Sequence, residues 1–289
     1  MASTCPSSAT ASSRSPRTTA RRRRCGSNTA SSTSAANIET GYRHIDTAQS
    51  YFNESEVGDG IKASGIDRKE LFVTTKVWLE HYGYEQTLKS VEVSLRKLKT
   101  DYIDLLLLHQ PFSDVYGSWH ALEKLYKDGV VRAIGVSNFF PYRLADLIAF
   151  NEIAPMVNQI ETNPFNQQVD AHAYMAEHGV VQEAWAPFGE GKSGMFTNPT
   201  LVAIGERHGK SPAQVILRWL MQRDIVALPK STHKERMAQN IDIFDFTLTD
   251  DDMASIAALD TRTSLFFDHA TPAAVERMAT LVKERAGRE

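Results

Sequence analysis

Polar residues that can do chemistry stand at the ends of several short apolar segments in this sequence. Asp46 and Tyr51 follow one such segment, Lys76 ends a second, and His109 follows four consecutive leucines. A tyrosine hydroxyl, with a pKa of about 10, is a weak proton donor near neutral pH. A lysine cation beside it favours the phenolate and lowers that pKa. A carboxylate would keep the lysine charged and a histidine would orient a carbonyl oxygen, so the four residues indicate a general-acid site for carbonyl reduction.

Each of these residues also has an ordinary structural explanation when it is taken alone. Asp46 can cap a turn, and Lys76 can be a surface cation. His109 can be a hydrogen-bonded core histidine, and Tyr51 can be an ordinary packing residue. His44 lies on the same strand face as Asp46, and with His109 these two suggest a metal-dependent barrel hydrolase as a minor alternative. No other strand end supplies a set of His, Asp or Glu ligands, so we expect no metal.

The elements that must position these residues are short apolar strands that alternate with amphipathic helices. Such alternation predicts a parallel sheet with right-handed crossovers. We favour a (β/α)8 TIM-type barrel, in which chemistry lies at the C-terminal ends of the strands. A doubly wound sheet is the alternative, but no G-x-G-x-x-G turn follows the first strand. The predicted strands cover residues 43–47, 71–76, 103–108, 131–136, 157–160, 180–184 and 225–228.

Six motifs in this region, in order, resemble those of the aldo-keto reductase family. The resemblance covers most of the chain, from about residue 36 to residue 268, and its wording near the C-terminus is similar to bacterial reductases of the 2,5-diketo-gluconate reductase type. The motifs are GYRHIDTAQSYFNESEVGDGI (41–61), LFVTTKVW (71–78), DYIDLLLLHQP (101–111), GVSNF (135–139), VNQIETNPF (157–165) and LPKSTHKERMAQN (228–240).

The resemblance implies the family's mechanism for the matching residues of this chain. Tyr51 would donate the proton, Lys76 would lower its pKa, Asp46 would hold Lys76, and His109 would position the substrate. NADPH would supply hydride to small aldehydes, dicarbonyls or keto-sugars. The implied cofactor residues are Ser137, Asn138 and Gln159 at the nicotinamide carboxamide, Trp185 stacked on its ring, Lys230, Ser231 and Arg236 at the 2′-phosphate, and Gln239 and Asn240 near the adenine.

Two aromatic residues just beyond the predicted catalytic strand ends, Trp78 and Phe112, are expected to wall the substrate pocket. A non-catalytic NADPH-binding barrel with a regulatory or interaction role is the alternative function. Turnover of NADPH with methylglyoxal would separate the two.

The N-terminal segment differs sharply in composition from the rest of the chain. Residues 1–37 contain no Val, Ile, Leu, Phe, Tyr or Trp, and they carry both cysteines and six arginines. Such a segment cannot bury enough apolar area to offset its ordering entropy. We expect residues 1–35 to be a disordered or aberrant segment in place of the first barrel strand, and residues 36–289 to form the barrel domain. A frame-shifted start, a basic tail and a transit peptide are the competing explanations.

Bulk composition excludes several other classes of protein. The formal net charge is -3, which does not favour nucleic acid or an anionic membrane as a partner. No apolar run approaches the roughly 18 residues of a membrane span. No cysteine follows Cys25, so disulfides and thiolate sites within the barrel are excluded. We expect a cytoplasmic, monomeric enzyme whose partner is a small carbonyl substrate.

Overall fold

The computed structural model describes residues 34–286 of the 289-residue chain. Residues 34–39 form a helix, so the last two residues of the expected aberrant segment, Ser34 and Ala35, are helical. The expectation for residues 1–33, including the missing first strand, lies outside the described residues. The domain boundary at residue 36 therefore stays a prediction.

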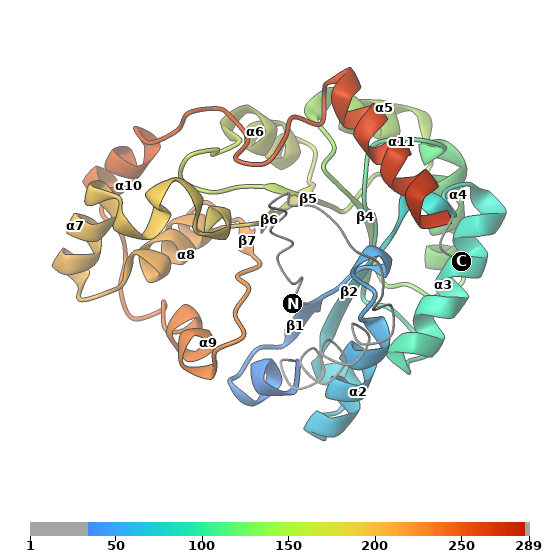
Figure 1. Cartoon of the computed structure of the whole chain (residues 1–289), viewed down its shortest axis with the longest axis horizontal. Coiled ribbons are helices and arrows are strands. Elements are labelled where there is room, and N and C mark those ends of the chain that lie inside the picture. Colours follow the sequence, from blue (N-terminus) through green and yellow to red (C-terminus); the bar gives the residue numbers. More distant parts are fainter. Residues whose placement is uncertain (1–33, 287–289) are drawn as a thin grey trace, which may run out of the picture.

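The described residues form one parallel sheet whose strands follow each other in chain order (Figure 1). Every predicted strand is present, with ends that differ from the prediction by at most three residues. Because each crossover contains helical structure, the sheet is covered by helices on its outer side. The arrangement is that of a TIM-type α/β barrel, with β1 and β7 as the outermost strands of the described sheet. The strands are β1 (His44–Asp46), β2 (Phe72–Val77), β3 (Leu105–Leu108), β4 (Ile134–Ser137), β5 (Val157–Glu161), β6 (Val181–Trp185) and β7 (Val226–Ala227).

Helices surround the sheet, with α2, α3 and α4 on one side and α7, α8 and α9 on the other (Figure 1). The sequence prediction omits the C-terminal helix α11 and the short 3-10 helices, two of which follow catalytic strands. The α-helices are α2 (Glu54–Ser64), α3 (Tyr84–Leu98), α4 (Val115–Lys127), α5 (Pro141–Phe150), α6 (Val169–Glu177), α7 (Pro199–His208), α8 (Pro212–Gln222), α9 (Lys234–Ile241), α10 (Asp250–Ala257) and α11 (Pro272–Ala286). The 3-10 helices are η1 (Gln49–Tyr51), η2 (Arg68–Glu70), η3 (Leu79–His81) and η4 (Gly189–Thr197).

The strand β3 shows how the sheet divides its side chains between two cores. Leu106 and Leu108 join the large cluster that the helices cover, whereas Leu105 and Leu107 join a small separate cluster with Val157. Successive side chains of a strand point to opposite faces. All four leucines are therefore buried, because both faces of the sheet are covered.

The same alternation sends the expected catalytic side chains to the inner face of the sheet. Ile45 and Val77 belong to the outer, helix-covered cluster. Their neighbours Asp46 and Lys76 therefore face inward, and Lys76 is in register with the inward-facing Leu107. The hydrophobic pattern of two short strands thus places a carboxylate and an amine in one interior.

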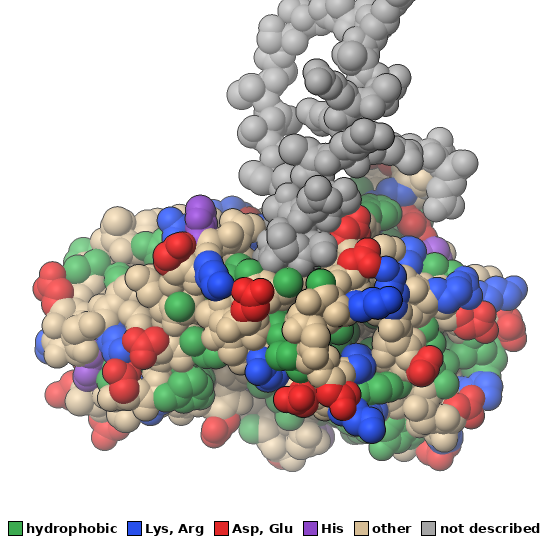
Figure 2. Space-filling model, turned by 90° about the horizontal axis from the view of Figure 1, so that it is seen from below, with side chains coloured by type: hydrophobic (Ala, Val, Ile, Leu, Met, Phe, Trp, Pro, Cys, Tyr) green, Lys and Arg blue, Asp and Glu red, His purple; other side chains and the backbone are tan. Residues whose placement is uncertain are grey.

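The surface carries charges of both signs. On the face that Figure 2 shows, Lys and Arg side chains alternate with Asp and Glu side chains over the described residues. Within residues 34–286, none of the helices is both long enough and apolar enough to cross a lipid bilayer.

The close contact between α2 and α3 depends on the absence of a side chain at Gly58. A Cβ atom at this position would lie 2.6 Å from the backbone oxygen of Lys97. We expect Gly58→Ala to lower the free energy of unfolding by about 2 kcal/mol, because the helices must move apart. Urea denaturation measures this change. Ser55→Ala on the exposed face of α2 is the control and should stay within about 0.5 kcal/mol of wild type; equal effects of the two substitutions would contradict the packing argument.

Candidate active site

The polar residues at the strand ends gather at the C-terminal edge of the sheet, as the topology requires. Asp46 ends β1, Lys76 is the penultimate residue of β2, Ser137 ends β4, and Trp185 ends β6. Gln159 lies in β5 opposite Ser137. Because parallel strands point the same way, residues far apart in sequence meet at this edge.

An ion pair between Lys76 and Asp46 lies at the centre of the site. The Lys76 amine has no exposed surface and donates hydrogen bonds to the Asp46 carboxylate and, over 3.0 Å, to the Thr47 carbonyl. Burial alone would lower the pKa of Lys76, but the Asp46 carboxylate outweighs it and raises that pKa. Burial likewise opposes the charge of Asp46, yet the Lys76 cation holds the pKa of that carboxyl below its ordinary value. Both groups are therefore charged near neutral pH.

Tyr51 and His109 complete the group of four that the sequence predicts. The 3-10 helix η1 brings the Tyr51 ring over the Lys76 amine, with 5.2 Å between the nitrogen and the ring centre. The His109 ring meets the Tyr51 ring edge-on, with 5.7 Å between the ring centres. The structure thus brings the amine and the phenol together at one place, which was the geometric condition for the expected chemistry.

The pKa of Tyr51 differs from the expectation in its net direction. Burial raises this pKa, and the Lys76 cation opposes the rise without reversing it. The expectation of a net lowering was therefore wrong for the protein without ligand, because desolvation of the phenolate exceeds the attraction of one cation. Burial and the Lys76 cation lower the pKa of His109 well below its ordinary value, so its imidazole is neutral.

The two expected pocket aromatics have different neighbours, and only Trp78 contacts the His109 ring. Trp78 is buried and meets the His109 ring edge-on, with 4.9 Å between ring centres. Phe112 is half-buried and stacks on His269, which lies in the loop just before α11. Ser50 was not predicted as a site residue, and its hydroxyl oxygen lies 3.3 Å from the Nδ1 atom of His109.

Ser137, Asn138 and Trp185 form one hydrogen-bonded unit. The Asn138 amide nitrogen donates to the His109 carbonyl over 3.0 Å and to the Ser137 hydroxyl over 3.2 Å. Its oxygen accepts from the Trp185 indole over 2.9 Å. The Ser137 hydroxyl donates to the Gln159 carbonyl over 2.8 Å. The Asn138 amide has therefore used both N–H groups, and only its oxygen can accept a further bond.

Glu183 is a site residue that the sequence prediction missed. Gln159 donates from its side-chain nitrogen to Asp46 and to Glu183, and both bonds are 2.9 Å long. Burial and the nearby Asp46 charge raise the pKa of Glu183 to about 7. His44 lies 4.0 Å from Glu183, and burial lowers the pKa of His44 to about 4. A signal was available, because Glu183 precedes Trp185 by two positions and so shares its strand face.

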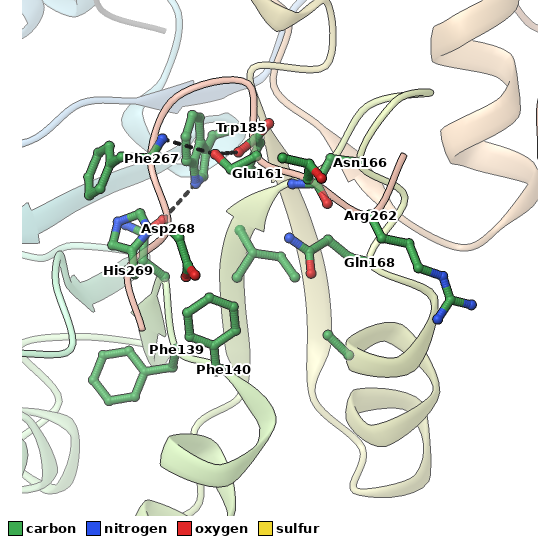
Figure 3. A pocket seen from close by; sticks show the side chains of 15 residues that line it. Phe139, Phe140, Glu161, Asn166, Gln168, Trp185, Arg262, Phe267, Asp268 and His269 are labelled. Carbon is green, nitrogen blue, oxygen red and sulfur yellow. Dashed lines mark hydrogen bonds between the residues drawn. The ribbon is translucent and has the colours of Figure 1, made fainter. Parts of the chain in front are cut away.

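A cavity of about 340 Å³ lies beside the Asn138 and Trp185 pair (Figure 3). The loop before α11 also lines this cavity, and buried Glu161 anchors the loop by accepting bonds from the Ser264 hydroxyl and the Leu265 amide. Phe266 of the same loop packs on Trp185, with 5.0 Å between ring centres.

A second cavity, of about 540 Å³, is lined by the segment after β7, the start of α8 and the helix α9, and it collects the other expected cofactor residues. Lys230 and Arg236 are exposed at its edge, whereas Ser231 and Asn240 are buried. Phe188 and Phe196 also line this cavity with apolar surface, and neither was predicted as a site residue. The lining includes Lys230, Ser231, Arg236, Gln239, Asn240, Phe188 and Phe196. In the part of the chain that the structure describes, no group of three His, Cys, Asp or Glu side chains is arranged to hold a metal ion.

The raised pKa of Glu183 predicts a pH-dependent stability. The folded-state pKa is about 7 against an ordinary value of 4.5, so the native protein binds this proton more tightly than the unfolded chain. The stabilisation is present below pH 4.5 and is lost as the pH rises through 7. Glu183→Gln, which is always neutral, should therefore raise the free energy of unfolding by up to about 3 kcal/mol at pH 8 and by less than about 1 kcal/mol at pH 5. An advantage that is the same at both pH values would contradict this ionisation.

Known proteins that are similar to this chain in sequence and structure point to one family. The aldo/keto reductase family model matches residues 22–261. Glyoxal reductase of Bacillus subtilis (strain 168) is 50% identical over 233 residues, which are 80% of this chain and 84% of that protein. The crystal structure of a putative 2,5-diketo-D-gluconic acid reductase B has a TM-score of 0.81 at 37% identity and matches 86% of this chain and 88% of its own. A Bombyx mori aldo-keto reductase in complex with NADP has a TM-score of 0.79 at 36% identity, over 86% of this chain and 88% of its own. This chain belongs to the aldo/keto reductase family.

Proposed function

We propose that this protein reduces small aldehydes and ketones, including dicarbonyls and keto-sugars, with NADPH as the hydride donor. The observation that carries the proposal is the buried Lys76–Asp46 ion pair beside Tyr51 and His109. Similarity to a glyoxal reductase supports small dicarbonyls as substrates, and similarity to a putative 2,5-diketo-D-gluconic acid reductase B supports keto-sugars.

Tyr51 is the proton donor in this proposal. Because burial holds its pKa above the ordinary value, the hydroxyl keeps its proton until a stronger base forms beside it. The alkoxide that develops from the carbonyl oxygen is such a base. The Lys76 cation then stabilises the phenolate that remains, and Asp46 keeps the cation in place.

His109 orients the carbonyl oxygen as a neutral donor. Its low pKa removes the charged form near neutral pH. If the Ser50 hydroxyl donates to Nδ1, the imidazole proton lies on Nε2 and is free to point at the substrate. Trp78 packs edge-on against the ring and restricts its rotation.

The residues present fit NADPH at both of its ends. Asn138 and Gln159 each retain an amide oxygen as acceptor, which suits the two N–H groups of a nicotinamide carboxamide. Trp185 offers an aromatic face beside them. Lys230, Ser231 and Arg236 edge the second cavity and would bind a 2′-phosphate through charge-assisted bonds. When bound, NADPH supplies the hydride that the carbonyl carbon receives.

Removal of the proton donor tests the chemical part of the proposal. We expect Tyr51→Phe to lower kcat for NADPH oxidation with methylglyoxal by about 100- to 10,000-fold, because the acid is lost. NADPH binding, followed by titration, should stay within about twofold. Tyr142→Phe, at an exposed tyrosine, is the control and should leave turnover unchanged. A wild-type protein that binds NADPH without turnover would instead favour a non-catalytic binding role.

Removal of one cation tests the preference for NADPH over NADH. Arg236→Met should raise the KM for NADPH by about tenfold or more, while the KM for NADH changes little, because only NADPH carries the 2′-phosphate. Lys234→Met is a matched control on the same helix, since the Lys234 amine pairs with Glu39 over 3.0 Å. Equal losses for both cofactors in Arg236→Met would contradict a 2′-phosphate role.

A further inference from the structure

The side-chain amide of Gln159 is held in one orientation by two carboxylates. Its nitrogen carries two N–H groups, and these donate to Asp46 Oδ2 and Glu183 Oε2 at 2.9 Å each. Gln159 is buried, with 2% of its surface exposed. The amide oxygen is consequently the only part of this side chain that can serve a ligand.

Asp46 alone would not hold the amide in this way. Without Glu183, one N–H of Gln159 would be buried without a partner, and the amide would gain by rotating to find one. With both carboxylates present, a rotated amide would bring its oxygen against two acceptors. Glu183 therefore gives the orientation of Gln159 much of its strength.

We propose that Glu183 is a positioning residue for the nicotinamide end of the cofactor, acting through Gln159. This inference rests on the proposed function. Glu183 fixes the Gln159 oxygen as an acceptor, so that it complements the Asn138 oxygen, whose own amide nitrogen is used by the His109 carbonyl and the Ser137 hydroxyl. The two acceptor oxygens, one from Asn138 and one from Gln159, would bind the –NH2 group of the carboxamide and not its oxygen.

The charges around Glu183 are compatible with this role in either protonation state. Asp46 and His44 of β1 and Lys76 of β2 face it across the interior. An ionised carboxylate accepts the Gln159 N–H strongly, and a protonated carboxyl still accepts it through its carbonyl oxygen. A glutamine at this position can do the same with its amide oxygen, but a methionine of similar size cannot.

The experiment compares Glu183→Met with Glu183→Gln for two ligands, NADPH and 2′-phospho-ADP-ribose, which lacks only the nicotinamide. We expect Glu183→Met to weaken NADPH binding by about tenfold and to leave the fragment within about twofold. Glu183→Gln should bind both ligands like the wild type. Glu183→Leu replaces the Met variant if thermal unfolding shows that the latter is not folded.

Two results would overturn the inference. One is an equal loss of affinity for NADPH and for the fragment in Glu183→Met, which would indicate a general structural role. The other is unchanged NADPH binding in that variant. Wild-type turnover with methylglyoxal is measured on the same preparation, and its absence would refute the proposed function while the ratio of the two affinities still decides the role of Glu183.

Discussion

A lysine ammonium without exposed surface requires a counter-ion in direct contact, and this requirement orders the interior of the protein. Removing a charge from water costs several kcal/mol, which only close pairing and further hydrogen bonds offset. Lys76 meets the condition through Asp46 and the Thr47 carbonyl. The strands β1 and β2 must therefore stay paired with Asp46 and Lys76 on the same inner face, because a one-residue slip would turn one of them outward.

The polar network extends from this pair in two directions. On one side, Asp46 accepts a hydrogen bond from Gln159, which also donates to Glu183. On the other side, the Lys76 amine lies against the ring of Tyr51, which the η1 helix holds in place. Such buried networks are stable only when each member has a partner. The chemistry proposed for Tyr51 thus depends on side chains of four strands, although the hydroxyl itself lies on none of them.

Much of this arrangement could be predicted from the sequence, for a physical reason. Alternation of strand and helix defines the barrel, and residues at strand ends such as Lys76 and His109 must then converge. Glu183 was missed although it shares a strand face with Trp185, because the side chains that give it a role, Gln159 and Asp46, are distant in the sequence. The C-terminal helix α11 was also missed, although Pro272 at its start and the apolar Val275, Met278 and Val282 are typical of a helix.

The direction in which the pKa of Tyr51 shifts could not be predicted from the sequence, because two opposing effects determine it. The sequence identifies the cation that lowers this pKa, but not the extent of burial that raises it. Only the packed structure shows that burial is the larger effect. The composition of residues 1–37 likewise predicts where apolar packing cannot occur, without predicting what the segment does.

The central claim is that Lys76 and Asp46 act on catalysis as one unit, and a double-mutant cycle tests it most directly. The kcat for NADPH-dependent reduction of methylglyoxal is measured for Lys76→Met, Asp46→Asn and the double variant. Since either change removes the same ion pair, the double variant should be little slower than the slower single variant, with a coupling energy of about 2 kcal/mol or more. Independent, additive losses from the two substitutions would contradict the account.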